Sequence, residues 1–228
     1  MTDTAGYYVD GLSAERLRKC YEVAPPRVRR YLEAELGHVL DHIRSSHCVL
    51  ELGCGYGRIL DKLAARARTV VGIDTSPSSV ELGKSLLARS SNCHLAAMDA
   101  VSLGFADAVF DVVVCIQNGI SAFKVDQQAL IKESVRVTRP GGTVLFSSYA
   151  SEFWSDRLEW FSLQAEHRLI GEIDWQQTRD GVIVCKDGFK ATTIGPDGFR
   201  ALCSSLGLEP RVEVVDGSSV FCEIGVGS

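Results

Sequence analysis

One glycine-rich stretch, residues 48–58, constrains the fold of this chain more than any other feature. It reads CVLELGCGYGR and opens with a short apolar run, residues 48–52, of the kind that a buried parallel strand needs. Three alternating glycines follow, and apolar residues then recur at helical spacing over residues 59–64. The stretch therefore predicts a strand, a tight turn and a helix. Glycines in such a turn let the backbone take positive φ and let a ligand lie directly against the main chain.

The spacing of the glycines indicates which ligand the turn would hold. A dinucleotide fingerprint has the spacing G-x-G-x-x-G, whereas Gly53, Gly55 and Gly57 give G-x-G-x-G, and Arg58 stands where the third glycine would be. Glu51 at the strand end is an unfavourable neighbour for a pyrophosphate and a favourable one for a positively charged ligand. A nicotinamide-dependent oxidoreductase is the alternative that these residues argue against.

At these residues the chain resembles the class I S-adenosylmethionine-dependent methyltransferases, whose first motif is an acidic residue followed by x-G-x-G-x-G. The resemblance extends over residues 48–148 with specific motifs and over residues 181–226 by pattern only. It implies an α/β fold with a doubly wound, mostly parallel sheet of seven strands in the order 3-2-1-4-5-7-6, the last strand antiparallel. It also implies S-adenosylmethionine as cofactor, S-adenosylhomocysteine as product, and a cofactor-binding turn made by Glu51, Gly53, Cys54, Gly55 and Gly57.

The length of 228 residues suits one α/β domain. Within it the resemblance implies four parts: an N-terminal helical lid (1–46), a cofactor-binding core (47–148), a substrate-recognition insertion (149–180) and a C-terminal strand, helix and strand (181–228). The net charge of −5 gives no basic field for nucleic acid or an anionic membrane. Without an apolar run that could span a bilayer or a signal-peptide pattern, we expect a cytoplasmic protein.

Eight cysteines are dispersed along the chain without a C-x-x-C pair. We interpret them as buried free thiols rather than a disulfide framework or a metal site. Arsenite, a thiophilic acceptor, ranks below a small organic one because no cysteine spacing picks out a binding set.

Two acidic residues follow the next strands at positions where the family binds its cofactor. Asp74 ends a strand over residues 69–73, where a carboxylate accepts hydrogen bonds from ribose hydroxyls; the alternative is a turn or cap residue. Asp99 follows a strand over residues 94–97, where the resemblance implies a bond to the adenine amino group; the alternative is a solvent-facing loop residue. The neighbours assigned to the cofactor by the same resemblance are Thr75, Met98 and Ala100.

The fourth strand, residues 111–115, leads to Gln117 and Asn118. Ligands bind at the carboxyl ends of central strands in an open α/β sheet, and the transferable methyl lies here in the resembled family. We therefore assign Gln117 to the cofactor and Asn118 to the substrate or to catalysis, against an ordinary Asn-Gly turn. The sequence has no N/D-P-P-Y/F/W motif, no Pro-Cys nucleophile and no aspartate at this strand end, which argues against base-modifying and metal-dependent enzymes.

The N-terminal residues predict two helices, over 12–21 and 26–44, the second with Pro26 in its first turn. They are interpreted either as packing on the sheet edge or as a lid whose tyrosines reach the substrate. The tyrosines in question are Tyr7, Tyr8 and Tyr21, and Tyr8 is also a weak catalytic candidate.

The insertion after the fifth strand (143–148) contains all three tryptophans. A helix over residues 152–169 would either pack these aromatics down or use Trp154 and Trp160 to wall a substrate pocket. His167 is a weak candidate for a general base. A strand over residues 181–186, a helix over 196–206 and a last strand over 218–225 complete the prediction.

The resulting hypothesis is a metal-independent methyltransferase that acts on a small molecule by in-line displacement, as a monomer or homodimer. A sulfonium activates its own methyl group, so the protein needs alignment and exclusion of water rather than a nucleophile of its own. A catalytically silent S-adenosylmethionine-binding module remains an alternative, because such transfer requires no diagnostic residue. A tRNA, protein or arsenite methyltransferase ranks behind both.

Overall fold

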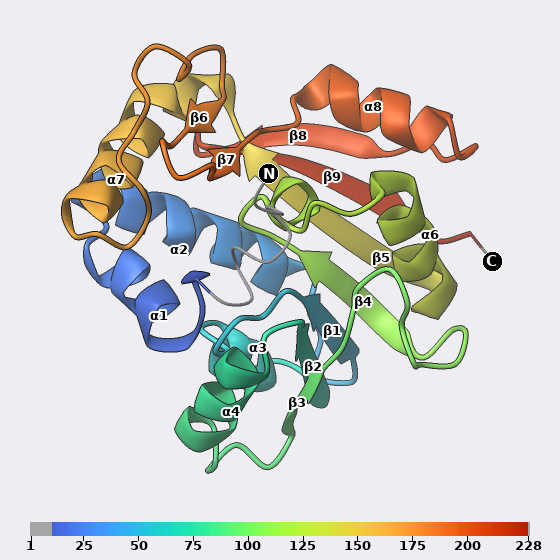
Figure 1. The fold of residues 1–228 in the computed structure, drawn as a ribbon. Helices are drawn as coiled ribbons and strands as arrows, with labels where there is room; N and C mark the ends of the chain where they lie inside the picture. The colour runs from blue at the N-terminus through green and yellow to red at the C-terminus, as the bar shows by residue number, and fades with distance from the viewer. Residues whose placement is uncertain (1–10, 228) are drawn as a thin grey trace.

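The computed structural model describes residues 11–227, and its centre is a twisted seven-stranded sheet (Figure 1). The strands are β1 (Cys48–Leu52), β2 (Thr69–Asp74), β3 (Cys93–Ala97), β4 (Phe110–Cys115), β5 (Thr138–Tyr149), β8 (Arg211–Val215) and β9 (Ser219–Gly225). Their order is β3-β2-β1-β4-β5-β9-β8, with β1 to β5 parallel and β9 antiparallel to its neighbours β5 and β8. The predicted fold and strand order are confirmed.

Strand residues alternate between two hydrophobic cores, one on each face of the sheet. Val49 and Val112 belong to one core, and their neighbours Leu50 and Val113 belong to the other. All four are almost fully buried. Continuous apolar runs are what strands covered on both faces require.

Helices cover both faces of the sheet. One face is covered by α2 (Pro26–Asp41) and α3 (Leu60–Ala64), the other by α6 (Gln127–Val137) and α8 (Pro196–Ser204). Helix α4 (Pro77–Leu86) packs beside β2 and β3, and the short α5 (Gly119–Ala122) follows β4. Ser76 and Asp126 cap α4 and α6 by accepting hydrogen bonds from backbone N–H groups of the first turn.

A third hydrophobic core lies beside the sheet, in what we call the cap lobe. The cap lobe consists of α1 (Ala14–Glu22), the 3-10 helix η3 (Ser151–Phe153), α7 (Trp154–Glu166) and residues 167–194, which include the hairpin β6 (Ile183–Val184) and β7 (Lys190–Ala191). The first half of α2 packs against it through Val28, Tyr31 and Leu32. Figure 1 shows α1, α2 and α7 together at the left, with the hairpin above α1 and α2 and beside α7.

The prediction for the C-terminal part was wrong in one element. Residues 181–186 are not the sixth strand of the main sheet, because only Ile183–Val184 is a strand there and it pairs within the separate hairpin. The sixth position in the sheet belongs to β8, which the sequence analysis missed. This edge strand has two charged residues, Arg211 and Glu213, and its apolar residues are half-buried or, at Val214, exposed, so its hydrophobic signal is weak.

Boundaries elsewhere differ by a few residues. The helix expected over residues 152–169 begins as η3 and ends at Glu166, and β5 begins at Thr138, five residues before the expected start at 143. Within residues 11–227, no helix is both long enough and apolar enough to cross a membrane.

Candidate active site

A cavity of about 310 Å³ opens at the carboxyl ends of β1, β2 and β4, beside α1. Its lining includes every predicted cofactor-binding residue except Gly57. Those residues are Glu51, Gly53, Cys54, Gly55, Asp74, Thr75, Met98, Asp99, Ala100 and Gln117.

The turn over residues 53–57, which we call the glycine turn, needs glycine for conformation and for space. The φ angles of Gly53, Gly55 and Gly57 are 71°, 54° and 77°, in the left-handed region. A Cβ on Gly53 would come within 2.4 Å of the Phe123 ring. Gly57 lies outside the cavity lining, and a Cβ there would meet the side chain of Leu87, so its glycine serves the turn and its packing.

The carboxylate of Asp74 fixes the glycine turn and faces the cavity. One oxygen accepts a hydrogen bond from the backbone N–H of Gly55 at 2.9 Å, and the other accepts from Ser76 at 2.8 Å. Burial raises the pKa of Asp74, and these two hydrogen bonds oppose the shift. Asp74 therefore has the turn contacts of the alternative interpretation while also lining the cavity.

Within residues 11–227, two buried polar side-chain atoms of the cavity wall have no hydrogen-bond partner. They are Oε2 of Glu51 and Nη2 of Arg58. Burial raises the pKa of Glu51 to about 8, Arg58 opposes the shift, and Asp74 adds to it. Arg58 is the one cation among the described residues that line the cavity, and the sequence analysis treated it only as a departure from the dinucleotide pattern.

Helix α1 contributes Tyr21 to the cavity. Its hydroxyl donates a hydrogen bond to Oε1 of Gln117 at 2.7 Å, and the Arg58 guanidinium lies 4.6 Å from the centre of its ring. Gln117 has a φ of 54°, and its backbone N–H donates to Oγ of Ser147. Tyr21, Arg58 and Gln117 thus bring α1, the glycine turn and the end of β4 into direct contact.

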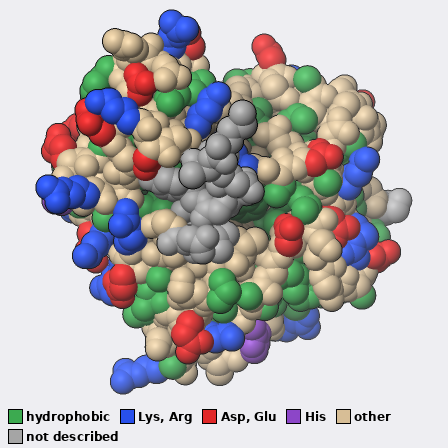
Figure 2. All heavy atoms as spheres, in the orientation of Figure 1, with side chains coloured by type: hydrophobic (Ala, Val, Ile, Leu, Met, Phe, Trp, Pro, Cys, Tyr) green, Lys and Arg blue, Asp and Glu red, His purple; other side chains and the backbone are tan. Residues whose placement is uncertain are grey.

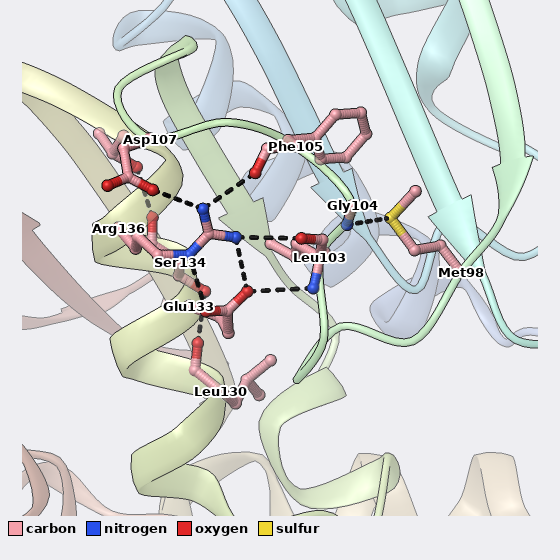
Figure 3. A network of polar contacts seen from close by, with 10 residues as sticks. Met98, Leu103, Gly104, Phe105, Asp107, Leu130, Glu133, Ser134 and Arg136 are labelled. Atoms are coloured by element: carbon pink, nitrogen blue, oxygen red, sulfur yellow. Dashed lines mark hydrogen bonds and ion pairs between the residues drawn. The ribbon is translucent and has the colours of Figure 1, made fainter.

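The loop after β3 is anchored from outside the cavity. Figure 3 shows Arg136 of α6 donating to the carbonyl of Leu103, while Glu133 accepts from the Leu103 N–H. The N–H of Gly104 is 3.4 Å from the sulfur of Met98, a cavity residue. The ion pair of Arg136 and Glu133 therefore fixes the loop beside the wall that Met98 helps to form.

Other predicted residues lie elsewhere. The Asn118 side chain is buried, donates to the carbonyl of Thr192 and accepts from Oγ of Ser148, so its amide links the cap lobe to the sheet outside the cavity lining. Its φ of 63° is in the left-handed region, as expected for the alternative interpretation of an ordinary Asn-Gly turn. His167 is exposed at the end of α7, outside the lining.

The aromatic residues of the insertion pack into the cap lobe. Trp160 is buried and donates its Nε1–H to the carbonyl of Cys20, and Trp154 packs against the same core. Neither lines the cavity, whereas Trp175 is 63% exposed. Tyr7 and Tyr8 lie outside the described residues.

No group of three or more His, Cys, Asp or Glu side chains within residues 11–227 could hold a metal ion. The eight cysteines carry free thiols, and Cys54 is the one that lines the cavity. Two of the thiols, Cys203 and Cys222, lie in contact in the buried core with their sulfur atoms 3.7 Å apart, away from the cavity.

Residues 49–142 match the family model described as a methyltransferase domain. The 2-methyl-6-phytyl-1,4-hydroquinone methyltransferase of Synechocystis is 30% identical over 136 residues, which cover 55% of this chain and 42% of that protein. The ubiquinone biosynthesis O-methyltransferase of Coxiella burnetii is 26% identical over 141 residues, covering 61% and 56%. This chain therefore spans about half the length of these relatives.

Among solved structures, the PH0226 protein of Pyrococcus horikoshii is similar with a TM-score of 0.65 and 22% sequence identity. The similarity covers 97% of this chain and 95% of that one, so the whole described architecture, cap lobe included, has a counterpart of the same fold.

Proposed function

We propose that this chain, which belongs to the class I S-adenosylmethionine-dependent methyltransferases, transfers a methyl group from that cofactor to a small molecule. The printed names of the two curated relatives identify a hydroquinone methyltransferase and an O-methyltransferase of ubiquinone biosynthesis. Both names concern small molecules, which supports an acceptor of that class here.

One observation carries the proposal: Oε2 of Glu51 and Nη2 of Arg58 line one cavity and have no hydrogen-bond partner in the part of the chain that the structure describes. A buried polar group without a partner is costly, so a ligand that pairs with it gains affinity there, and an ammonium group beside Glu51 would favour the ionised carboxylate. The amino-acid end of S-adenosylmethionine carries an ammonium and a carboxylate. We assign the ammonium to Glu51 and the carboxylate to Arg58.

The rest of the cavity fits the other parts of the cofactor. Gly53 and Gly55 let the ligand approach the backbone closely, and Asp74 retains acceptor capacity for ribose hydroxyls. Asp99 is assigned to the adenine amino group. The residues assigned to the surrounding walls are Cys54, Thr75, Met98, Ala100 and Gln117.

When bound, the cofactor would supply an electrophilic methyl group for the acceptor's lone pair, with its sulfur as the leaving group. The chain's own residues align the reactants and exclude water. Helix α1 covers the cavity with Leu17 and Tyr21, and Phe123 closes the side next to Gly53. Burial raises the pKa of Tyr21, so its hydroxyl stays protonated and acts as a hydrogen-bond donor.

Calorimetric titration with S-adenosylmethionine, S-adenosylhomocysteine and NAD tests the proposal. We expect the first two to bind and NAD not to bind. Glu51→Gln should reduce the affinity for S-adenosylmethionine and for S-adenosylhomocysteine by roughly tenfold or more, since a hydrogen bond to a charged group is worth about 1.5–3 kcal/mol. The control is Glu81→Gln, the same change on the exposed face of α4.

Asp74→Ala should weaken binding further, because it also removes the acceptor that holds the Gly55 N–H. Binding of NAD alone would overturn the proposal. Binding of S-adenosylmethionine with no transfer to any member of a broad acceptor screen would identify a silent binding module instead.

A further inference from the structure

Glu35 of α2 is a buried carboxyl group that lies outside the cavity lining. Most charged side chains of residues 11–227 are at least partly exposed, and Figure 2 shows acidic and basic groups interspersed over one face of the molecule. Glu35 is instead fully buried, and its Oε1 accepts hydrogen bonds from Oγ of Ser147 at 2.6 Å and from Oγ of Ser219 at 2.9 Å. The carboxyl group therefore ties α2 to both β5 and β9.

Ser147 connects this carboxyl group to the cavity wall. A hydroxyl has one proton to donate and two lone pairs with which to accept. Because its proton is donated to Glu35, Oγ of Ser147 presents a lone pair to the backbone N–H of Gln117, which donates to it at 2.9 Å. Oε1 of Gln117 in turn accepts from the hydroxyl of Tyr21 at 2.7 Å. Three hydrogen bonds, joined through the covalent frame of Gln117, thus lead from the buried carboxyl group to helix α1.

The N–H that Ser147 accepts from belongs to a residue in an unfavourable backbone conformation. Gln117 and Asn118 have φ angles of 54° and 63°, a region that asparagine tolerates better than glutamine, so Gln117 depends more on outside support. The next serine, Ser148, supports Asn118: its Oγ donates to Oδ1 of Asn118 at 2.7 Å and accepts from the N–H of Ile194 at 2.9 Å. Two consecutive, fully buried serines of β5 therefore fix two consecutive left-handed residues after β4.

We propose that Glu35 is a positioning residue for cofactor binding: through Ser147 it holds Gln117 in the conformation that lines the cavity. The proposal rests on the proposed function and adds a residue outside the cavity to the same site. Without an acceptor for its N–H, Gln117 lowers its free energy by leaving the left-handed region, and its side chain then moves away from the hydroxyl of Tyr21. Helix α1, which covers the cavity with Tyr21, thereby loses its hydrogen bond to the residues that follow β4.

Two matched variants, Ser147→Ala and Ser219→Ala, test the proposal. Each removes a hydroxyl that donates to Oε1 of Glu35, but only Ser147 also accepts from the N–H of Gln117. Amide hydrogen exchange of Gln117 is measured by NMR without ligand, and the affinity for S-adenosylhomocysteine is measured by calorimetry. In Ser147→Ala we expect the exchange to accelerate and the affinity to fall, each by roughly fivefold or more, the value of one hydrogen bond. Ser219→Ala should change either quantity by less than about twofold, whatever stability it loses.

Two substitutions of Glu35 itself complete the experiment. Glu35→Gln keeps an oxygen that accepts from Ser147, so it should retain both the slow exchange of Gln117 and the affinity for S-adenosylhomocysteine, whereas Glu35→Leu should lose both. The two serine variants decide the question even if Glu35→Leu does not fold. Equal losses in the two serine variants, or wild-type exchange and affinity in Ser147→Ala, would overturn the proposal. Failure of the wild type to bind S-adenosylhomocysteine would instead contradict the proposed function, because the exchange of Gln117 is measured without ligand.

Discussion

The glycine turn and the cap lobe are assembled in opposite ways. In and around the glycine turn the hydrogen bonds join residues close in sequence: Asp74 contacts Ser76 two residues on and Gly55 nineteen residues back. In the cap lobe, Trp160 contacts Cys20 over 140 residues, and Arg16 contacts the carbonyl of Leu169 over 153 residues.

This difference indicates that substitutions in the glycine turn and substitutions in the cap lobe should have separate effects. The glycine turn is defined by its backbone conformation and by the carboxylate of Asp74. The cap lobe depends on aromatic packing around a buried cation, Arg157, which is 1% exposed. Cofactor binding and acceptor binding should therefore respond to different substitutions.

The largest expected effect follows from removing that cation. Arg157 donates to the carbonyls of Gly181 and Ala191, and its guanidinium lies 4.5 Å from the ring centre of Tyr149. In Arg157→Leu both carbonyls lose their donor, at about 1–3 kcal/mol each, and the cation–π contact is lost as well. We expect the free energy of unfolding, measured by urea denaturation, to fall by about 3–5 kcal/mol.

Limited proteolysis should locate the damage within residues 167–194, while S-adenosylhomocysteine affinity of the folded protein changes little. Arg179→Leu, at an exposed arginine of the same lobe, is the matched control. If Arg157→Leu strongly reduced the affinity for S-adenosylhomocysteine as well as the stability of the cap lobe, the two regions would not be independent.

A second prediction concerns Glu35, where α2 passes between the two regions. This carboxylate is fully buried and accepts hydrogen bonds from Oγ of Ser147 at 2.6 Å and of Ser219 at 2.9 Å. Burial raises its pKa to about 7, and the two serines and Arg58 oppose the shift. Because the pKa is higher in the folded chain than in the unfolded one, the stabilisation is complete below the unfolded value and is lost as pH rises through 7.

We expect the free energy of unfolding of the wild type to decrease by on the order of 2 kcal/mol between about pH 5 and pH 8 on account of Glu35. Glu51, with a pKa raised to about 8, adds a decrease of the same sign. Urea denaturation across this range should give a flatter profile for Glu35→Gln, whereas Glu33→Gln, an exposed residue of the same helix, should match the wild type. Parallel profiles for Glu35→Gln and the wild type would refute the assignment.

The same contrast explains what the sequence could predict. Glu51, Asp74 and Asp99 are found from sequence because each ends or follows an apolar strand, and parallel strands bring their carboxyl ends to one edge. Trp160 and Asn118 are not placed by such a rule. Their positions depend on contacts with residues more than 70 positions away, Cys20 and Thr192.

Arg58 and β8 were missed for other reasons. Arg58 follows the glycine turn, and its importance comes from the Tyr21 ring of a distant helix and from the acidic lining, neither of which a spacing pattern contains. Strand β8 is an edge strand whose residues are half-buried or exposed, so its apolar signal is weaker than that of the central strands. Local motifs predicted the turn, and long-range packing decided the rest.

The smallest expected effect lies on the cofactor side, at Arg136. Its guanidinium donates to the carbonyls of Leu103 and Phe105 and pairs with Glu133 (Figure 3). These contacts reach the cavity only through the loop beside Met98, and most of the guanidinium's partners are partly exposed. Arg136→Gln should therefore weaken the binding of S-adenosylhomocysteine by only about two- to fivefold. In free energy this is less than the roughly 1 kcal/mol of a typical hydrogen bond.

Calorimetry with S-adenosylhomocysteine measures this change, with Lys132→Gln on the exposed side of α6 as control. The cap lobe should keep its resistance to proteolysis, because no contact of Arg136 reaches residues 149–194. A loss of cofactor affinity as large as that in Asp74→Ala would mean that the adenine side of the cavity depends on this loop anchor as strongly as the ribose side depends on its carboxylate. An unchanged affinity would mean that Met98 and Asp99 are held by the strand end alone, and that the turn side of the molecule is even more locally determined than its hydrogen bonds indicate.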